Sequence, residues 1–275
     1  MIRNHVSEQE VEMLLNDILE RYGYDFTEYA HASINRRVNH LYQSDRFPSF
    51  AEFRYRIISD PEYAMRFVEE ITVNVTEMFR DPHFYSALKQ AVLPVLATYP
   101  FIRIWHAGCS SGEEVYSLAI LLKEANLLHK SVIYATDINT SVLEKGRKGI
   151  FPISQMQQYS RNYMQAGGLQ DFSAYYTANY EYAKFSEYLG EKIIFSPHNL
   201  VTDGSFNEFQ LIICRNVLIY FNKNLQDKVL RLFCDSLEQL GFLALGSKET
   251  LNFTTVVRQF KQLENKEKIW RKNHL

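Results

Sequence analysis

Residues 102–117 read IRIWHAGCSSGEEVYS, and this stretch decides the fold. The pattern predicts a strand that ends at Ala107, a tight turn between Gly108 and Gly112, and a helix that begins directly after the turn. β-Branched and aromatic residues favour the strand, and apolar residues recur at helical spacing over 115–122. A strand, a glycine turn and a helix in this order are how α/β folds hold a nucleotide-like ligand at the carboxyl end of a sheet.

The chemistry of the turn indicates which ligand fits it. Its spacing is Gly-x-x-x-Gly rather than the Gly-x-Gly-x-x-Gly of dinucleotide-binding folds. Because Glu113 and Glu114 follow the second glycine at once, the helix N-terminus is a poor phosphate site. A ligand with a positive centre and no phosphate fits better, and S-adenosylmethionine is one. Residues 108–112 also match the Gly-x-Ser-x-Gly turn of hydrolases, but no Asp-then-His pair follows at later strand ends.

Composition excludes several classes of protein. Of the 275 residues 46% are hydrophobic, which is typical of a folded globular chain. The net charge of −2 provides no field that would attract nucleic acid or an anionic membrane. The three cysteines are widely spaced, which favours a reducing compartment and argues against a disulfide framework or a metal site. With a polar N-terminus and no apolar run of about 20 residues, we expect no signal peptide, no membrane span and a cytoplasmic protein.

Residues 1–72 predict a small all-α domain. Ser7 and Glu10 form a capping box for a helix over 7–23, and further helices are expected over 28–43, after Ser49 and from Pro61. Arg36 and Arg37 stand side by side on the second helix, either as a solvated face or as a contact surface for an acidic partner.

A junction over 71–81 follows, with alternating β-branched and polar residues. From residues alone, Asn74, Thr76 and Arg80 in this junction are either ordinary linker polar groups or ligand-binding groups. A further helix is expected from Asp81-Pro82 to about residue 98.

The chain then alternates between strands and helices, which predicts a mostly parallel sheet covered on both faces. The second strand, 132–138, ends in Asp137, where such folds hold ribose hydroxyls. The alternative for Asp137 is a helix N-cap shared with Asn139 and Thr140. Later strands are expected over 192–196, 209–214 and 242–245, with a helix from Asn222 or Asn224 to Gly241 and a closing antiparallel hairpin over 256–263 and 267–271.

Residues 152–190 interrupt this alternation of strands and helices. The segment is rich in tyrosine, and the partial alternation over 172–185 predicts two or three antiparallel strands. An inserted sheet of this kind either docks a peptide strand or uses its aromatic residues to cover the main domain.

Four stretches together carry a resemblance to a known family. They read TVNVTEMFRDPH (72–83), WHAGCSSGEEVYS (105–117), ATDI (135–138) and ICRNVLIYF (213–221). With these motifs, nearly the whole chain resembles the chemotaxis-receptor glutamate methyltransferases of the CheR type. The resemblance implies a Rossmann-like class I methyltransferase domain over 73–275, with an inserted antiparallel β subdomain at about 152–190 and the all-α domain over 1–72 in front of it.

The resemblance also implies an activity. Such a protein uses S-adenosylmethionine to form glutamyl methyl esters on methyl-accepting chemoreceptors and releases S-adenosylhomocysteine. Arg36 and Arg37 would contact acidic receptor helices, and the inserted subdomain would dock a peptide. The alternatives are a methyltransferase of the same fold for another protein, and a non-catalytic cofactor-binding scaffold. A DNA adenine methyltransferase is disfavoured, because Arg215-Asn-Val-Leu stands where Asp/Asn-Pro-Pro-Tyr/Phe is required.

By the same resemblance, Asp137 would hold the ribose, Asn199 and Leu200 would flank the adenine, and Arg80 and Tyr220 would be catalytic, with a packed aromatic as the alternative for Tyr220. The residues that the resemblance implies for cofactor binding are Asn74, Thr76, Arg80, Gly108, Glu114, Asp137, Asn199, Leu200, Arg215 and Asn216.

Overall fold

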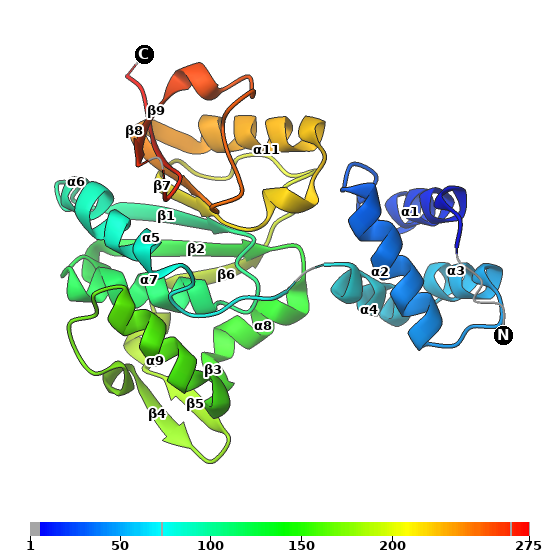
Figure 1. Ribbon diagram of the computed structural model, residues 1–275, viewed down its shortest axis with the longest axis horizontal. Helices are drawn as coiled ribbons and strands as arrows, with labels where there is room; N and C mark the ends of the chain where they lie inside the picture. The colour runs from blue at the N-terminus through cyan, green and yellow to red at the C-terminus, as the bar shows by residue number, and fades with distance from the viewer. Residues whose placement is uncertain (1–5, 73, 265, 275) are drawn as a thin grey trace. The chain divides into compact units, whose positions relative to one another are not determined.

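The computed structural model describes residues 6–72, 74–264 and 266–274, which divide into two compact units (Figure 1). The helical unit holds Met1–Val73 and Ile219–Lys228, and the sheet unit holds Asn74–Leu218 and Val229–Leu275. Each unit is described by itself.

Four helices build the helical unit: α1 (Glu8–Tyr22), α2 (His31–Ser44), α3 (Phe50–Ser59) and α4 (Pro61–Ile71). The predicted capping box is confirmed, because the Ser7 side chain accepts from Glu10 N and the Glu10 side chain accepts from Ser7 N. Gly23 ends α1 in the left-handed conformation, at φ +77°. Buried aromatic residues such as Phe26, Phe53 and Phe67 form part of the core between these helices.

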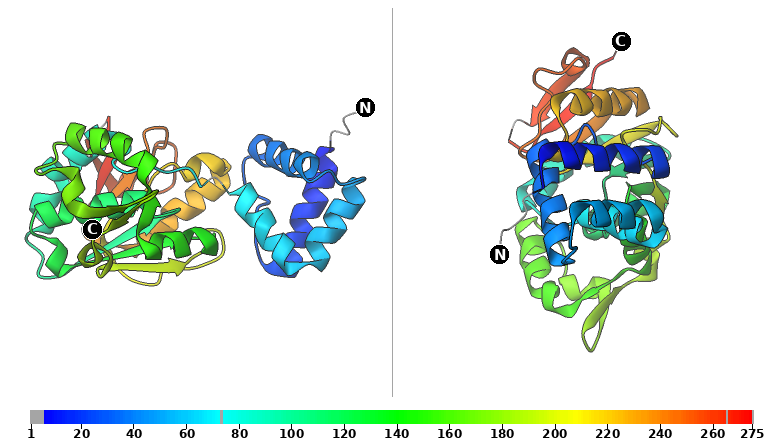
Figure 2. Two further views of the ribbon diagram at one scale, coloured as in Figure 1. Left: turned by 90° about the horizontal axis from the view of Figure 1, so that it is seen from below. Right: turned by 90° about the vertical axis from the view of Figure 1, so that its right-hand side faces the viewer.

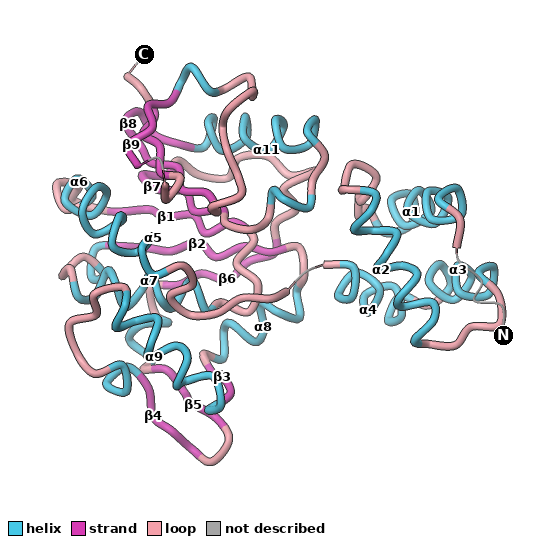
Figure 3. The backbone as a smooth tube through the Cα atoms, in the orientation of Figure 1, coloured by secondary structure: helices cyan, strands magenta, loops and turns pink. Residues whose placement is uncertain are grey.

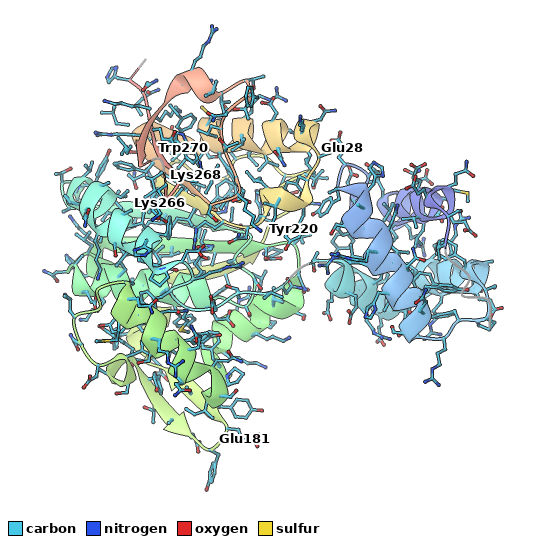
Figure 4. The ribbon with its side chains drawn as sticks, viewed as in Figure 1. Glu28, Glu181, Tyr220, Lys266, Lys268 and Trp270 are labelled. Atoms are coloured by element: carbon cyan, nitrogen blue, oxygen red, sulfur yellow. The ribbon has the colours of Figure 1, made fainter. Side chains whose placement is uncertain are left out.

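A later segment completes the helical unit. The short helix η5 (Leu218–Tyr220) and the start of α11 (Lys223–Ser236) flank Phe221, which bridges to Tyr29 in antiparallel fashion. Main-chain hydrogen bonds of 2.8 Å from Ala30 N to Tyr220 O and 2.9 Å from Asn222 N to Glu28 O tie the same two segments together. Glu28 and Tyr220 are labelled in Figure 4.

Within the described residues of the sheet unit, seven strands form one sheet in the order β6-β2-β1-β7-β8-β10-β9. The strands are β1 (Ile102–Ala107), β2 (Ser131–Asp137), β6 (Ile193–Pro197), β7 (Phe209–Cys214), β8 (Leu237–Leu245), β9 (Phe260–Glu264) and β10 (Ile269–Lys272). From β6 to β8 all neighbours are parallel, and β9 and β10 form an antiparallel hairpin. The chain therefore places successive strands on both sides of β1, and the carboxyl ends of β1, β2, β6, β7 and β8 meet at one edge, the ligand-binding edge of open α/β sheets.

Helices pack beside these strands. They are α5 (Pro82–Ala87), a π-helical turn (Leu88–Val92), α6 (Leu93–Leu96), α7 (Glu113–Glu124) and α8 (Thr140–Lys148). Figure 1 shows α8 below the strands and α11 above them. Every residue of β7 is buried, as a central parallel strand requires. The expected helix over 82–98 is thus present, with a π-helical turn in its middle.

A small sheet, β3-β5-β4, forms the inserted subdomain within the described part of the chain. It joins β3 (Ile150–Pro152), β4 (Tyr176–Asn179) and β5 (Tyr182–Phe185) in antiparallel pairs, and α9 (Met156–Gln165) lies between β3 and β4 in sequence. The hairpin of β4 and β5, yellow-green, projects from the sheet unit in Figure 1 and in the right-hand view of Figure 2. The predicted antiparallel strands are confirmed, whereas α9 was not predicted.

The structure corrects one element boundary. The sequence predicts a helix that continues through Leu237 and Leu240 to Gly241, but α11 ends at Ser236 and β8 begins at Leu237. Leu237 pairs with Phe209, and the register with β7 shifts before Leu211 pairs with Phe242. The prediction was wrong because a leucine at helical spacing also suits a buried strand.

Candidate functional site

The turn between β1 and α7 is held against the end of β2. Gly108 N and Cys109 N both donate to Thr136 O, at 2.8 and 2.9 Å. Gly108 lies at φ +70° and Gly112 at φ +92°, a region that glycine adopts without strain. A Cβ on Gly108 would lie 2.3 Å from Val217 Cγ2, so glycine is also required for the loop after β7 to approach this closely.

Asp137 at the end of β2 faces this turn. Its Oδ2 accepts from Ser110 N at 2.8 Å and its Oδ1 accepts from Asn139 N at 3.0 Å. Burial raises the pKa of the Asp137 carboxyl, and these backbone hydrogen bonds oppose the shift. The N-cap alternative is excluded, because Asn139 caps α8 by accepting from Ser141 N and Val142 N.

A buried ionic cluster lies beside the turn and joins residues from four segments. Arg215, directly after β7, places Nη1 3.1 Å from Glu114 Oε2 and Nη2 2.6 Å from Asp81 Oδ2. His106 Nε2, on β1, lies 3.4 Å from Glu114 Oε1. The guanidinium also stacks on the Phe84 ring, 4.1 Å from its centroid. Burial opposes ionisation of Glu114, but Arg215 and His106 outweigh it and lower the pKa of the carboxyl to about 2.

The junction over 74–81 is loop throughout, drawn in pink in Figure 3. Phe79 and Asp81 adopt left-handed conformations on either side of Arg80, at φ +52° and +54°. Phe79 N donates to Ser117 Oγ on α7 at 2.9 Å, and Arg80 O accepts from Arg215 Nη1 at 3.3 Å. The main chain at Arg80 is therefore anchored to the ionic cluster, and the Arg80 Nη1 donates to Val75 O at 3.4 Å. Asn74 and Thr76 are half-buried in the same loop.

Asn199 and Leu200 follow β6, whose end is tied to β2 by a hydrogen bond of 3.1 Å from His198 N to Asp137 O. Asn199 Oδ1 accepts from Val201 N at 2.9 Å, which shapes a local turn, and Leu200 is buried. The end of β6 is thus brought to the same sheet edge as Asp137.

Two residues at this edge were missed by the sequence analysis. The sequence pattern predicts only that His106 is part of a strand, and gives no sign that it contacts Glu114. Glu249 follows β8, and its carboxylate accepts main-chain hydrogen bonds from the loop after β7. The rule that selected Asp137, an acid just beyond a buried strand, also describes Glu249 and could have found it.

Several buried polar atoms at this edge lack a hydrogen-bond partner among the described residues: Tyr85 Oη, Ser110 Oγ, Glu114 Oε1 and Asn216 Oδ1. An unpaired polar group in the interior costs free energy. Atoms of this kind, beside a turn that glycines open, fit a ligand that carries hydroxyl and amino groups, as a nucleoside does.

Two family models match this chain side by side. One, described as the all-alpha domain of CheR methyltransferase, matches residues 9–72, and the other, described as the SAM binding domain of CheR methyltransferase, matches residues 74–269. The chain belongs to the CheR methyltransferase family. The predicted family and fold class are thereby confirmed, and the cofactor of the CheR chain is S-adenosylmethionine.

Curated relatives of this CheR chain are similar over most of their length. A protein of Pseudomonas putida with the provisional name methyltransferase Cher3 is 45% identical over 264 residues, which cover 96% of this chain and 97% of the relative. The chemotaxis protein methyltransferase of Listeria innocua is 32% identical over 83% of this chain and 85% of its own. Among solved structures, the N-methyltransferase NodS of Bradyrhizobium japonicum shares 12% identity, over 72% of this chain and 90% of its own, at a TM-score of 0.43.

The remaining predicted residues of the CheR chain belong to the helical unit. Tyr220 belongs to the helical unit, where its carbonyl is paired with Ala30. On α2, Arg36 is exposed, while Arg37 is half-buried and donates to Glu70 O at 3.4 Å. Among the residues for which the structure gives a placement, no helix is long and apolar enough to cross a membrane.

The aromatic residues of the inserted subdomain serve two roles. Tyr159, Tyr163 and Tyr175 are buried and pack into the core of the sheet unit, whereas Tyr180 at the hairpin tip is 97% exposed. The buried tyrosines thus cover the main domain, one of the two sequence alternatives, while docking of a peptide strand stays a prediction.

Proposed function

We propose that this chain transfers a methyl group from S-adenosylmethionine to glutamate side chains of chemoreceptors and forms methyl esters. The observation that carries the proposal is the match to both CheR models over nearly the whole chain. It is supported by relatives whose names, in Listeria innocua and Salmonella typhimurium, are chemotaxis protein methyltransferase. Because receptors of this kind present their methylated helices to the cytoplasm, the proposal places the protein there.

Residues at the carboxyl edge of the sheet would hold the cofactor. In this proposal Asp137 accepts the ribose hydroxyls, since a carboxylate accepts two hydrogen bonds from a cis-diol. The residues that would line the rest of the cofactor site are Asn74, Thr76, Arg80, Gly108, Glu114, Asn199, Leu200, Arg215 and Asn216. When bound, the cofactor supplies an electrophilic methyl group on a positively charged sulfur. Asn216 Oδ1, which has no hydrogen-bond partner among the described residues, supports this fit as an acceptor for a ligand donor.

The reaction needs little acid–base help from the protein. A glutamate side chain is ionised at pH 7, so it attacks as a carboxylate and no general base is required. The task of this chain is therefore to orient the carboxylate for in-line attack and to exclude water. Arg80 as the partner of the incoming carboxylate and Tyr220 as an orienting group stay predictions. The matched test for Arg80 is Arg80→Lys against Arg80→Ala, and the test for Tyr220 is Tyr220→Phe, which removes only the hydroxyl.

The partner surfaces follow the same proposal. Acidic receptor helices would contact α2 through Arg36, whose exposed guanidinium is free to reach a partner, and through Arg37. The exposed end of the β4–β5 hairpin would dock a peptide.

The test is a transfer assay with labelled S-adenosylmethionine and membranes that carry methyl-accepting receptors. We expect label on receptor bands that mild base releases as methanol, because esters hydrolyse under conditions that amides and N-methyl groups resist. Asp137→Ala should abolish the labelling, and Glu124→Gln, a buried substitution at the far end of α7, should retain it.

Other results would contradict the proposal in distinct ways. Base-stable label, or label on nucleic acid, would exclude glutamyl ester formation. Base-labile label on a protein that is not a receptor would keep the chemistry and replace the substrate. Cofactor binding without any transfer would favour a non-catalytic scaffold.

A further inference from the structure

A single buried carboxylate accepts hydrogen bonds from the main-chain N–H groups of two loops at the candidate site. Glu249, in the loop after β8, is 4% exposed. Its Oε1 accepts from Val217 N at 2.9 Å and Leu218 N at 2.8 Å. Its Oε2 accepts from Gly246 N at 2.6 Å and Asn216 N at 3.1 Å. Both oxygens are thus used, each by two main-chain N–H groups, and only an ionised carboxylate can accept in this way at every position.

The loop that Glu249 holds is the one that presents two cofactor-site residues. Three of the four donors follow β7 directly, next to Arg215 in the ionic cluster. Asn216 lies in the left-handed region at φ +61°, which asparagine adopts more readily than other non-glycine residues and which hydrogen bonds to its main chain help to hold. The Glu249 carboxylate holds this conformation because it accepts hydrogen bonds from the N–H groups of Asn216 and of the two residues that follow.

Two glycines at this edge lie too close to the loop after β7 for a side chain. A Cβ on Gly246 would lie 2.9 Å from Asn216 N, and a Cβ on Gly108 would lie 2.3 Å from Val217 Cγ2. The loops after β1, β7 and β8 therefore pack against one another with no room for one additional carbon. A shift of the loop after β7 would move both Arg215 and the wall of the glycine turn.

We propose that Glu249 is a positioning residue of the cofactor site, which acts through the loop after β7 and sets the places of Arg215 and Asn216. The proposal rests on the placement of S-adenosylmethionine at this sheet edge and is independent of which molecule accepts the methyl group. Glu249 itself needs no contact with the cofactor, because its four acceptor positions are already occupied by the protein.

The test compares two substitutions of Glu249 by calorimetric titration with S-adenosylhomocysteine. Glu249→Gln keeps the size but turns an NH2 group toward two main-chain N–H donors, so we expect at least a tenfold loss of affinity. Glu249→Asp keeps the charge on a side chain shorter by one methylene, and we expect a smaller loss. Hydrogen exchange of the amides of residues 216–218 should speed up in both variants, which reports on the loop without any reaction.

The matched control is Glu124→Gln, which also neutralises a buried carboxylate of the sheet unit. Glu124 accepts from Tyr175 Oη at 3.1 Å and Leu169 N at 2.9 Å, and from Tyr163 Oη, all in or beside the inserted subdomain. We expect it to lower the melting temperature while affinity stays within twofold and exchange at 216–218 is unchanged.

Four other outcomes would overturn the positioning role of Glu249 or the placement of the cofactor. A folded Glu249→Gln protein with wild-type affinity overturns the positioning role, and so does a loss of affinity that Glu124→Gln matches at equal stability. Failure of both Glu249 variants to fold assigns the carboxylate to folding as a whole and also overturns it. If wild-type protein itself does not bind S-adenosylhomocysteine, the placement of the cofactor fails first, and that result is distinguishable from the others.

Discussion

Replacing Glu114 by glutamine tests the ionic cluster at the candidate site. The substitution keeps the side-chain volume and removes the charge that lies 3.1 Å from Arg215 Nη1. Of its two carboxylate partners, the buried guanidinium would retain Asp81, whose side chain is 45% exposed and therefore a weaker partner. Removing one member of a buried ion pair costs roughly 3–5 kcal/mol. With Asp81 still in place, we expect the free energy of unfolding at pH 7 to fall by about 3 kcal/mol.

The pKa of Glu114 expresses the same interaction as a dependence on pH. The value of about 2 lies below the ordinary value of 4.5. A lowering of this size corresponds to roughly 3 kcal/mol, the same order as the cost of breaking the pair. Because the folded-state pKa is depressed, this stabilisation is complete above about pH 4.5 and is lost as the pH falls toward about 2. Wild-type protein should therefore lose about 2 kcal/mol of it by pH 3, while the glutamine variant loses none.

The assay is urea denaturation at pH 7 and at pH 3, with Glu113→Gln as the control. Glu113 is the preceding residue, also buried, but burial raises the pKa of its carboxyl, so neutralising it should leave stability at pH 7 unchanged or slightly higher. The reasoning is refuted if Glu114→Gln costs less than about 1 kcal/mol at pH 7, or if the gap between it and wild type does not narrow at pH 3.

Three further substitutions probe other features. Gly108→Ala should destabilise by about 1–3 kcal/mol, because it puts a Cβ at φ +70° against Val217; Gly204→Ala, with open space around its Cα, should be near neutral in the same urea titration, and equal effects would contradict the argument. Asp137→Ala should weaken S-adenosylmethionine binding about tenfold or more, since charged hydrogen bonds contribute about 1.5–3 kcal/mol each; unchanged affinity by calorimetry would remove the ribose assignment. Ser7→Ala should cost the helical unit about 1 kcal/mol through the lost cap, measured by circular dichroism during denaturation, and a cost near zero would show that the capping box contributes nothing.

The features that the sequence predicted correctly have local causes. The capping box at Ser7 depends on residues three apart, and the left-handed end of α1 depends on Gly23 alone. Strand β7 was predictable because a continuous apolar run between polar segments suits a central parallel strand. The end of β2 at Asp137 followed from the same kind of run.

The features that the sequence did not predict depend on contacts between distant segments. Leu237 continues the apolar stripe of α11, and only its pairing with Phe209 makes it the first residue of β8. Helix α9 was obscured by tyrosines that the sequence analysis associated with strands. The partners of Arg215 stand on two other segments, so no spacing rule relates them.

The roles of Glu114 and Arg215 in the structure also differ from the roles that their residue types suggest. Taken singly, Glu114 is a ligand-binding acid and Arg215 a cation that closes the site. Together they form a buried pair whose charges cancel, with Glu114 Oε2 facing the guanidinium and Glu114 Oε1 without a hydrogen-bond partner. Arg215 thus faces one oxygen of this carboxylate, and His106 faces the other.

This pairing suits a cofactor that carries positive charge on sulfur. An unpaired arginine at the same edge would repel a sulfonium, whereas Arg215 between Glu114 and Asp81 is neutralised by two carboxylates. Asp137 adds a further acid at this edge. The arginine can therefore hold the loop after β7, the junction at 80–81 and the start of α7 together at little electrostatic cost to a cationic ligand. If the acceptor is an ionised carboxylate, as proposed, methyl transfer requires orientation and no proton transfer, and buried charges that hold loops in place serve such a reaction better than free acids and bases would.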